Sequence, residues 1–313
     1  MVDAGPLRPP LTVLRVVVTA PPTPAITADK PKKELIVLVG GYGTGPDSQV
    51  FDAFRARVAQ ENVYEVVRFG HDLGSYDTFG GVDANADQLR DSIRSVSGSY
   101  DGVHIVTHSM GGVVADRAFA RGLSASDGVT TYVAWASPHD GSRAAQAMQA
   151  TLTLSGPGRD DTRAFTTAYF RDPDSDAVRD LARARAVAPP SGVVRLDLRL
   201  ATDALVMGAD ARDPGVPSRV LLPTSIGELE GHGGILQSEQ ALDLTLATIK
   251  TRSVPPDRRG GLLLAASAVV SQTVDGYAHV VLGGVCTLCL IGGVGGLLRR
   301  TFRRAVPWPP VGE

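Results

Sequence analysis

Cysteine and histidine are both scarce in this chain of 313 residues. The two cysteines, Cys286 and Cys289, lie three positions apart in a strongly apolar stretch, and no second pair of ligands accompanies them. We interpret them as small apolar residues rather than as a redox or zinc motif, and we expect neither a metal nor a cofactor. With only six histidines in the chain, a catalytic imidazole has few candidates.

An excess of charge of one sign is also absent. The formal net charge is -2 and 20% of the residues are charged, which gives no reason to expect nucleic acid or another polyanion as a partner. Hydrophobic residues make up 43% of the chain, a normal share for a protein that buries a core. The length suffices for one large domain or two small ones.

The N-terminus lacks the features of a secretory signal peptide. It begins Met-Val-Asp-Ala-Gly-Pro without a basic region, and Arg15 interrupts the apolar run from Leu11 to Ala20. We expect a strand over residues 14–19, followed by a linker that contains several prolines. Residues 1–33 are therefore predicted to form an N-terminal strand and linker.

From residue 34 onward, apolar runs alternate with segments of helical periodicity. The run Leu35 to Val39 is uniformly apolar, which is typical of a strand buried on both faces. Further strands are predicted over residues 63–69, 103–107, 129–136, 193–200 and 219–222, and helices over residues 48–59, 84–96, 110–121 and 236–250. This order predicts an α/β domain over residues 34–252, with a mostly parallel central sheet flanked by helices.

The alternation of predicted strands and helices is interrupted over residues 143–191. Short helical pieces occupy this segment, and glycines and prolines break them. We expect a helical cap that is inserted into the domain and packs over the edge of the sheet.

The C-terminal residues 253–313 differ in kind from the rest. Residues 277–298 contain no Asp, Glu, Lys or Arg and are long enough to cross a bilayer as a helix. Four arginines follow, which places the end of the span in the cytoplasm. With the shorter run 260–274, the pattern favours a hairpin of two spans that turns at Asp275 and Gly276. The large domain would then be membrane-associated on the cytoplasmic side. One span with the domain outside, and a buried soluble hairpin, are the alternatives.

The segment Val106-Thr-His-Ser-Met-Gly-Gly-Val113 joins a buried strand to a helix through a serine. A serine at such a sharp corner is exposed at the edge of the sheet, which makes Ser109 the predicted nucleophile. The glycines at 111 and 112 leave room for the turn and for close packing of the helix. A helix N-cap is the alternative role for the serine, but it accounts for neither His108 nor the glycine pair.

A serine needs a base, and the base needs an orienting acid. Of the two histidines well beyond the insertion, His279 lies in the apolar C-terminal run, so His232 in a glycine-rich loop is the predicted base. Asp203 directly follows a predicted strand and is the predicted acid, with Asp210 and Asp213 as fallbacks. An exposed loop histidine and a surface carboxylate are the plain alternatives.

Two backbone N–H groups are expected to bind the oxyanion of the transition state. Met110 follows the nucleophile, and Tyr42 lies in the loop Gly40-Gly-Tyr-Gly43 after the first strand of the domain. A plain glycine-rich turn is the alternative. The glycine spacing does not match the Gly-x-Gly-x-x-Gly of dinucleotide-binding loops.

Three segments of this sequence resemble the α/β-hydrolase superfamily, and within it the bacterial lipase/esterase branch related to GPI inositol-deacylase-like lipases. They are Val39-Gly-Gly-Tyr-Gly43, Thr107-His-Ser-Met-Gly-Gly112 and Ala136-Ser-Pro-His-Asp-Gly-Ser142. The segment Ala177-Val-Arg-Asp-Leu-Ala182 also resembles part of lipase caps. The likeness spans residues 34–250, although Thr107 and Gly40 stand where the family often has Gly and His.

The resemblance implies an α/β-hydrolase fold and acyl-transfer chemistry. We therefore expect a lipase-like serine hydrolase that cleaves carboxylic esters, with a small ester or a lipid as substrate and the membrane as a partner through its C-terminal helices. His139, in the third segment, is expected to be structural rather than catalytic. A thioesterase or peptidase on the same residues, and a non-catalytic membrane-tethered binding module, are the alternatives.

Overall fold

A computed structural model describes residues 33–45, 48–155, 171–188, 190–211, 215–259 and 263–280. Its centre is a parallel sheet of six strands in the order β2-β1-β3-β4-β5-β6. The strands are β1 (Glu34–Val39), β2 (Tyr64–Arg68), β3 (Val103–His108), β4 (Val129–Trp135), β5 (Val194–Leu200) and β6 (Ser218–Leu221). All six agree with the sequence prediction to within a residue or two, whereas the predicted strand 14–19 lies outside the described residues.

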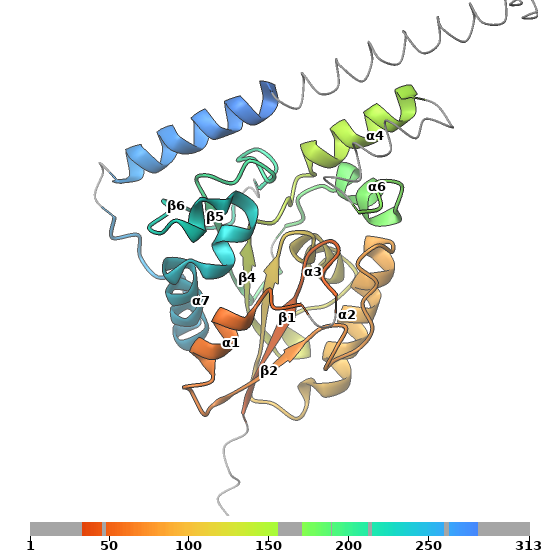
Figure 1. Cartoon of the computed structure of the whole chain (residues 1–313). Helices are drawn as coiled ribbons and strands as arrows, with labels where there is room; N and C mark the ends of the chain where they lie inside the picture. Colours follow the sequence, from red (N-terminus) through yellow and green to blue (C-terminus); the bar gives the residue numbers. More distant parts are fainter. Residues whose placement is uncertain are drawn as a thin grey trace, which may run out of the picture. The chain divides into compact units, whose positions relative to one another are not determined.

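Helices cover both faces of this sheet (Figure 1). Helices α1 and α7 lie on one side, and α2 and α3 lie on the other. Their bounds are α1 (Asp52–Val58), α2 (Val82–Ser97), α3 (Met110–Ala120) and α7 (Glu239–Thr251). Helix α1 is shorter than predicted because residues 48 and 49 are irregular and residues 50 and 51 form a turn before it.

The two faces of the sheet bury two separate apolar clusters. In β1, Leu35, Val37 and Val39 pack with residues of α2 and α3, whereas Ile36 and Leu38 pack with residues of α1 and α7. Successive side chains of a strand point to opposite faces, so a strand covered on both sides needs an unbroken apolar run. The sheet is therefore a rigid base, and its carboxyl edge holds the loops described below.

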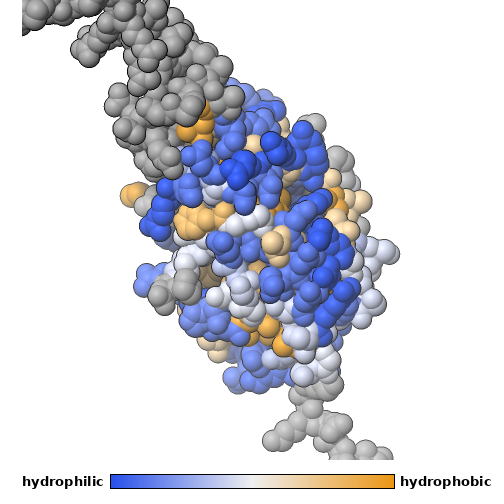
Figure 2. All heavy atoms as spheres, turned by 90° about the vertical axis from the view of Figure 1, so that its right-hand side faces the viewer, coloured by the Kyte–Doolittle hydropathy of each residue, from blue (hydrophilic) through white to orange (hydrophobic). Residues whose placement is uncertain are grey.

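The outer surface over α2 is polar. Figure 2 shows the face that carries this helix, where hydrophilic residues predominate and apolar residues form small separate patches. Ion pairs link α2 to α3, with Asp83 bound to Arg117 at 2.7 Å and Asp87 bound to Arg121. These pairs are partly exposed, so we attribute the attachment of α2 mainly to its buried residues, such as Leu89 and Ile93.

The predicted insertion contains two described helices, α4 (Arg143–Ser155) and α6 (Asp176–Arg183). The Ser175 side chain accepts the Val178 N–H and caps the start of α6. Ala177 and Leu181 are buried in the cluster formed with α2 and α3. Helix α6 therefore packs on the domain, beside the carboxyl edge of the sheet.

The C-terminal segment departs from the predicted hairpin. Residues 263–280 form one continuous helix that passes through Asp275 and Gly276, so the expected turn there is wrong. This helix contacts the domain through a hydrogen bond from the Gly208 N–H to Asp275 of 3.0 Å and through an Arg199–Ser271 hydrogen bond. In the described part of the chain, no helix is both long and apolar enough to cross a membrane. Most of the predicted span 277–298 lies outside the described residues.

Candidate active site

Ser109 occupies the corner between β3 and α3. Its backbone has φ 57° and ψ −128°, and it is one of three described non-glycine residues with positive φ. Such a conformation is strained for an L-residue and persists only where the surroundings hold it. Here the Ser109 N–H donates to the Trp135 carbonyl at 2.9 Å, which ties the corner to the end of β4.

Two close approaches explain the glycines around this corner. A Cβ atom added to Gly111 would lie 2.3 Å from the Val39 carbonyl oxygen. A Cβ atom on Gly41 would lie 2.7 Å from the Ser109 Cβ. The loop after β1 is therefore packed directly against the serine, as the oxyanion assignment requires.

His232 and Asp203 form a hydrogen-bonded pair. The distance from His232 Nδ1 to Asp203 Oδ2 is 2.9 Å. The other carboxylate oxygen accepts the N–H groups of Leu205 (3.0 Å) and Val206 (2.9 Å), so the buried acid is held at both oxygens. A bond from Nδ1–H to the acid leaves Nε2 of a neutral imidazole as the basic atom.

His232 lies in a kinked 3₁₀ segment, η2 (Gly227–Gln237), where the sequence predicted a loop. The kink is at Gly231, whose φ of 73° falls in the left-handed region that glycine adopts without strain. This change of direction immediately precedes the histidine.

One cavity of about 330 Å³ is lined by three of the five predicted residues. Ser109, His232 and Tyr42 all line it. His232 Nε2 is buried and has no hydrogen-bond partner among the described residues. Apolar side chains complete the wall: Val50, Pro138, Leu181, Leu205 and Val206.

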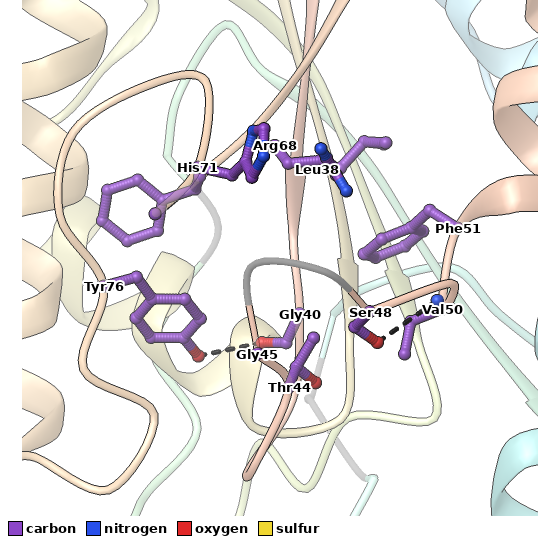
Figure 3. Close-up of a pocket in the computed structure, with 12 residues that line it drawn as sticks. Leu38, Gly40, Thr44, Gly45, Ser48, Val50, Phe51, Arg68, His71 and Tyr76 are labelled. Carbon is purple, nitrogen blue, oxygen red and sulfur yellow. Dashed lines mark hydrogen bonds between the residues drawn. The ribbon is translucent and has the colours of Figure 1, made fainter.

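The predicted oxyanion loop is held at its first residue. Figure 3 shows the Tyr76 hydroxyl pointing at Gly40, and it donates to the Gly40 carbonyl at 2.8 Å. Burial raises the pKa of Tyr76, so this phenol stays protonated and remains a donor. The second predicted donor, Met110, provides the first amide of α3, and the first amides of a helix have no partner within the helix.

A second contact links the same loop to the cap segment. The Tyr42 hydroxyl donates to the Asp172 carbonyl at 2.7 Å and accepts the Asp172 N–H at 2.8 Å. The Tyr42 ring also packs edge-on against Phe79, with ring centroids 5.1 Å apart. The residue whose backbone N–H is the expected oxyanion donor is thus fixed through its side chain as well.

The comparisons with known proteins concern the fold. The family model of palmitoyl protein thioesterases matches residues 35–181, slightly less than half of the chain. No curated protein matches the chain in sequence. A Bacillus licheniformis lipase, BlEst2, superposes with a TM-score of 0.51 at 16% identity, covering 71% of this chain and 93% of that one. The chain has the α/β-hydrolase fold.

Two further solved structures were matched with lower scores. A thermophilic esterase from Thermogutta terrifontis has a TM-score of 0.44 at 16% identity, with 71% of this chain and 91% of that chain covered. Aspergillus fumigatus lipase B has a TM-score of 0.48 at 16% identity, with coverages of 77% and 56%. The finer resemblance to GPI inositol-deacylase-like lipases stays a prediction.

Within this fold, the described fallback acid, Asp210, has its contacts away from His232. Asp210 accepts the Arg143 N–H at 3.1 Å, and burial raises the pKa of Asp210 to about 6. A carboxyl group that is partly protonated near neutral pH stabilises a histidine cation less well than a fully ionised one does. Asp213 lies outside the described residues. Asp203 is therefore the acid that the geometry favours.

His139 belongs to a buried ion cluster outside the cavity lining. Its Nδ1 lies 2.6 Å from Asp116, and Arg195 binds both Asp116 and Asp197 at 3.2 Å. Burial alone would lower the pKa of His139, but the two carboxylates outweigh burial and raise it. The cluster joins α3 to β5 and to the end of β4, which agrees with a structural role.

Several residues around the site have no role that the sequence indicates. His108 lies within the motif but follows no pattern of its own, and the side-chain bonds of Tyr42 and Tyr76 join segments that are distant along the chain. The segment Ala136–Ser142 did carry a signal, because Pro138 and Ser142 both line the cavity. Nothing in the local sequence around Tyr76 indicates its partner 36 residues earlier.

Proposed function

We propose that this protein is a serine hydrolase that cleaves carboxylic esters through an acyl-enzyme, with Ser109 as nucleophile, His232 as base and Asp203 as orienting acid. The observation that carries the proposal is the shared cavity, in which a strained serine lies together with a histidine whose Nδ1 is bound to a buried carboxylate. This combination is what activation of a hydroxyl requires.

The reaction follows from these groups. Ser109 Oγ attacks the ester carbonyl while His232 Nε2 takes the hydroxyl proton, and the Met110 and Tyr42 N–H groups bind the oxyanion. His232 then gives that proton to the departing alcohol, which leaves an acyl group on Ser109. A water molecule that gives a proton to His232 attacks the acyl group, and the carboxylic acid is released as Ser109 regains its proton.

The apolar wall of the cavity supports an acyl group as the part of the substrate that is bound. Leu205 and Val206 follow the acid, and Leu181 is contributed by the cap helix α6. Apolar walls with a few convergent polar groups are the usual composition of a small-molecule site. We infer that the acyl chain lies between the cap and the acid loop.

A thioesterase is the second candidate function. The match of residues 35–181 to the palmitoyl protein thioesterase family model favours it. A thioester uses the same nucleophile, base and oxyanion donors and differs only in its leaving group. Matched oxygen and sulfur esters of the same acyl chain distinguish the two activities by their kcat/KM values.

Hydrolysis of a short-chain nitrophenyl ester tests the proposal. Ser109→Ala is expected to reduce turnover by at least about 10³-fold, since the nucleophile is lost. Ser95→Ala is a matched control, because Ser95 is exposed on α2 and its hydroxyl donates to the Ser92 carbonyl. Ester hydrolysis that persists in Ser109→Ala would refute the assignment. Absence of turnover and of fluorophosphonate labelling in the wild type would favour the non-catalytic binding module.

A further inference from the structure

His108 is buried between the sheet and the segment that carries the predicted base. It is the last residue of β3, next to Ser109, and is only 7% exposed. Its Nε2 lies 3.2 Å from the main-chain carbonyl oxygen of His232. The two imidazole rings also lie in contact in a tilted arrangement, with centroids 4.8 Å apart and planes inclined by 37°.

The carbonyl partner fixes the tautomer of His108. A carbonyl oxygen only accepts, so Nε2 must carry the hydrogen and donate it. Burial, and then the charge of the neighbouring His232, lower the pKa of His108 to about 3. The ring is therefore neutral at physiological pH, and its Nδ1, which is buried without a partner among the described residues, carries the lone pair.

Two contacts hold His232 from different sides. Asp203 binds its side chain at Nδ1, whereas His108 binds its main chain. The kink at Gly231 directly precedes His232. Because the backbone is not regularly helical at this point, another contact must fix the position of His232. The side-chain bond alone fixes the ring relative to Asp203, but not the position of the segment relative to the serine corner.

We propose that His108 is a positioning residue that ties the main chain of His232 to the strand end bearing Ser109 and so sets the distance from the base to the nucleophile. This inference rests on the proposed serine hydrolase function. Because residues 108 and 109 are consecutive, the tether couples the base to the same rigid β3 that presents the hydroxyl. Reaction rates are sensitive to such placement, since an error of about 1 Å can cost about 10²-fold.

A packing role for His108 makes a different prediction from a donor role. Gln and Met have similar length and flexibility, and both remove the imidazole ring, but only Gln offers an N–H near the original Nε2 position. If His108 acts through its hydrogen bond, Gln should restore function and Met should not. If it acts only by filling space, the two variants should behave alike.

The experiment measures kcat and KM for a nitrophenyl ester in wild type, His108→Gln and His108→Met, with thermal unfolding of each. We expect His108→Met to lower kcat about 10- to 100-fold with KM changed less than about threefold, and His108→Gln to lie within about fivefold of the wild type. Equal kcat values for the two variants would overturn the inference.

Ser109→Ala, assayed in parallel, separates this inference from the proposed function. If turnover depends on Ser109 but His108→Met retains the wild-type kcat, the positioning role is wrong and the hydrolase assignment stands. If wild-type turnover does not depend on Ser109, the proposed function fails and the inference fails with it. If His108→Met does not fold, a kcat for His108→Gln more than about tenfold below the wild-type value overturns the inference.

Discussion

At the scale of single residues, the site depends on a backbone conformation that residues other than glycine rarely adopt. Ser109 holds a positive φ, which costs on the order of 1–3 kcal/mol in a non-glycine residue. The hydrogen bond to Trp135 and the close contact with Gly41 keep it there. This backbone conformation directs the hydroxyl away from its own backbone and into the cavity.

Gly41→Ala tests this packing directly. The new Cβ would lie 2.7 Å from the Ser109 Cβ, so either the serine or the loop after β1 must move. We expect kcat/KM to fall about 10- to 100-fold, because both the nucleophile and the oxyanion loop would be displaced. Ester hydrolysis kinetics of the purified variant provide the measurement.

Gly45→Ala is the matched control in the same loop, since no atom of the described residues lies within 4 Å of its added Cβ. This variant should keep kcat/KM within about twofold of the wild type. Equal activity of both alanine variants would show that the contact between Gly41 and Ser109 does not position the serine.

Several residues of the site were predictable from sequence, and others were not. Ser109, His232 and Asp203 stand out because each follows a recognisable local pattern: a glycine-flanked corner, a glycine-rich loop and a strand end. The tethers from His108 and Tyr76 are not visible in this way. They join segments 124 and 36 residues apart, and such contacts exist only once the sheet has formed.

At the scale of elements, the buried ion cluster joins α3 to β5 beneath the site. Removing one partner of a buried pair leaves an uncompensated charge, which typically costs about 3–5 kcal/mol. Asp116 receives contacts from His139, from Arg195 and from the Tyr132 hydroxyl at 3.2 Å. The cluster therefore holds the helix that follows the nucleophile.

The free energy of unfolding should depend on pH through His139. Asp116 and Asp197 raise its pKa against the effect of burial, so the folded state binds its proton more tightly than the unfolded state does. This contribution is fully present below the unfolded pKa of about 6.5 and is lost as pH rises through the higher folded pKa.

Urea unfolding of wild type and His139→Gln from about pH 6 to about pH 9 isolates this term, because every other titrating group is common to both proteins. The wild type should lose its stability advantage over the variant as pH increases. A difference that stays constant over this range would contradict the raised pKa.

At the scale of the whole molecule, most of the fold was predictable from the sequence, whereas the continuous helix over residues 263–280 was not. Short runs rich in apolar residues predicted all six described strands, and the uniformly apolar run Leu35 to Val39 belongs to β1, which is covered on both faces. The run 260–274 is apolar too, yet residues 263–280 form one helix in which Ser267, Ser271 and Ala278 are buried and Ser271 bonds to Arg199. Hydropathy does not report such a contact, because small residues allow close packing whatever their polarity.

The central claim is that Ser109 is a nucleophile activated by His232, and covalent labelling tests it most directly. The full-length protein is treated with a fluorophosphonate, and the adduct is located by mass spectrometry of its peptides. The account predicts a single adduct on Ser109 that is absent in Ser109→Ala and forms at least about 10²-fold more slowly in His232→Gln. An adduct on another residue, or unchanged labelling in His232→Gln, would contradict it.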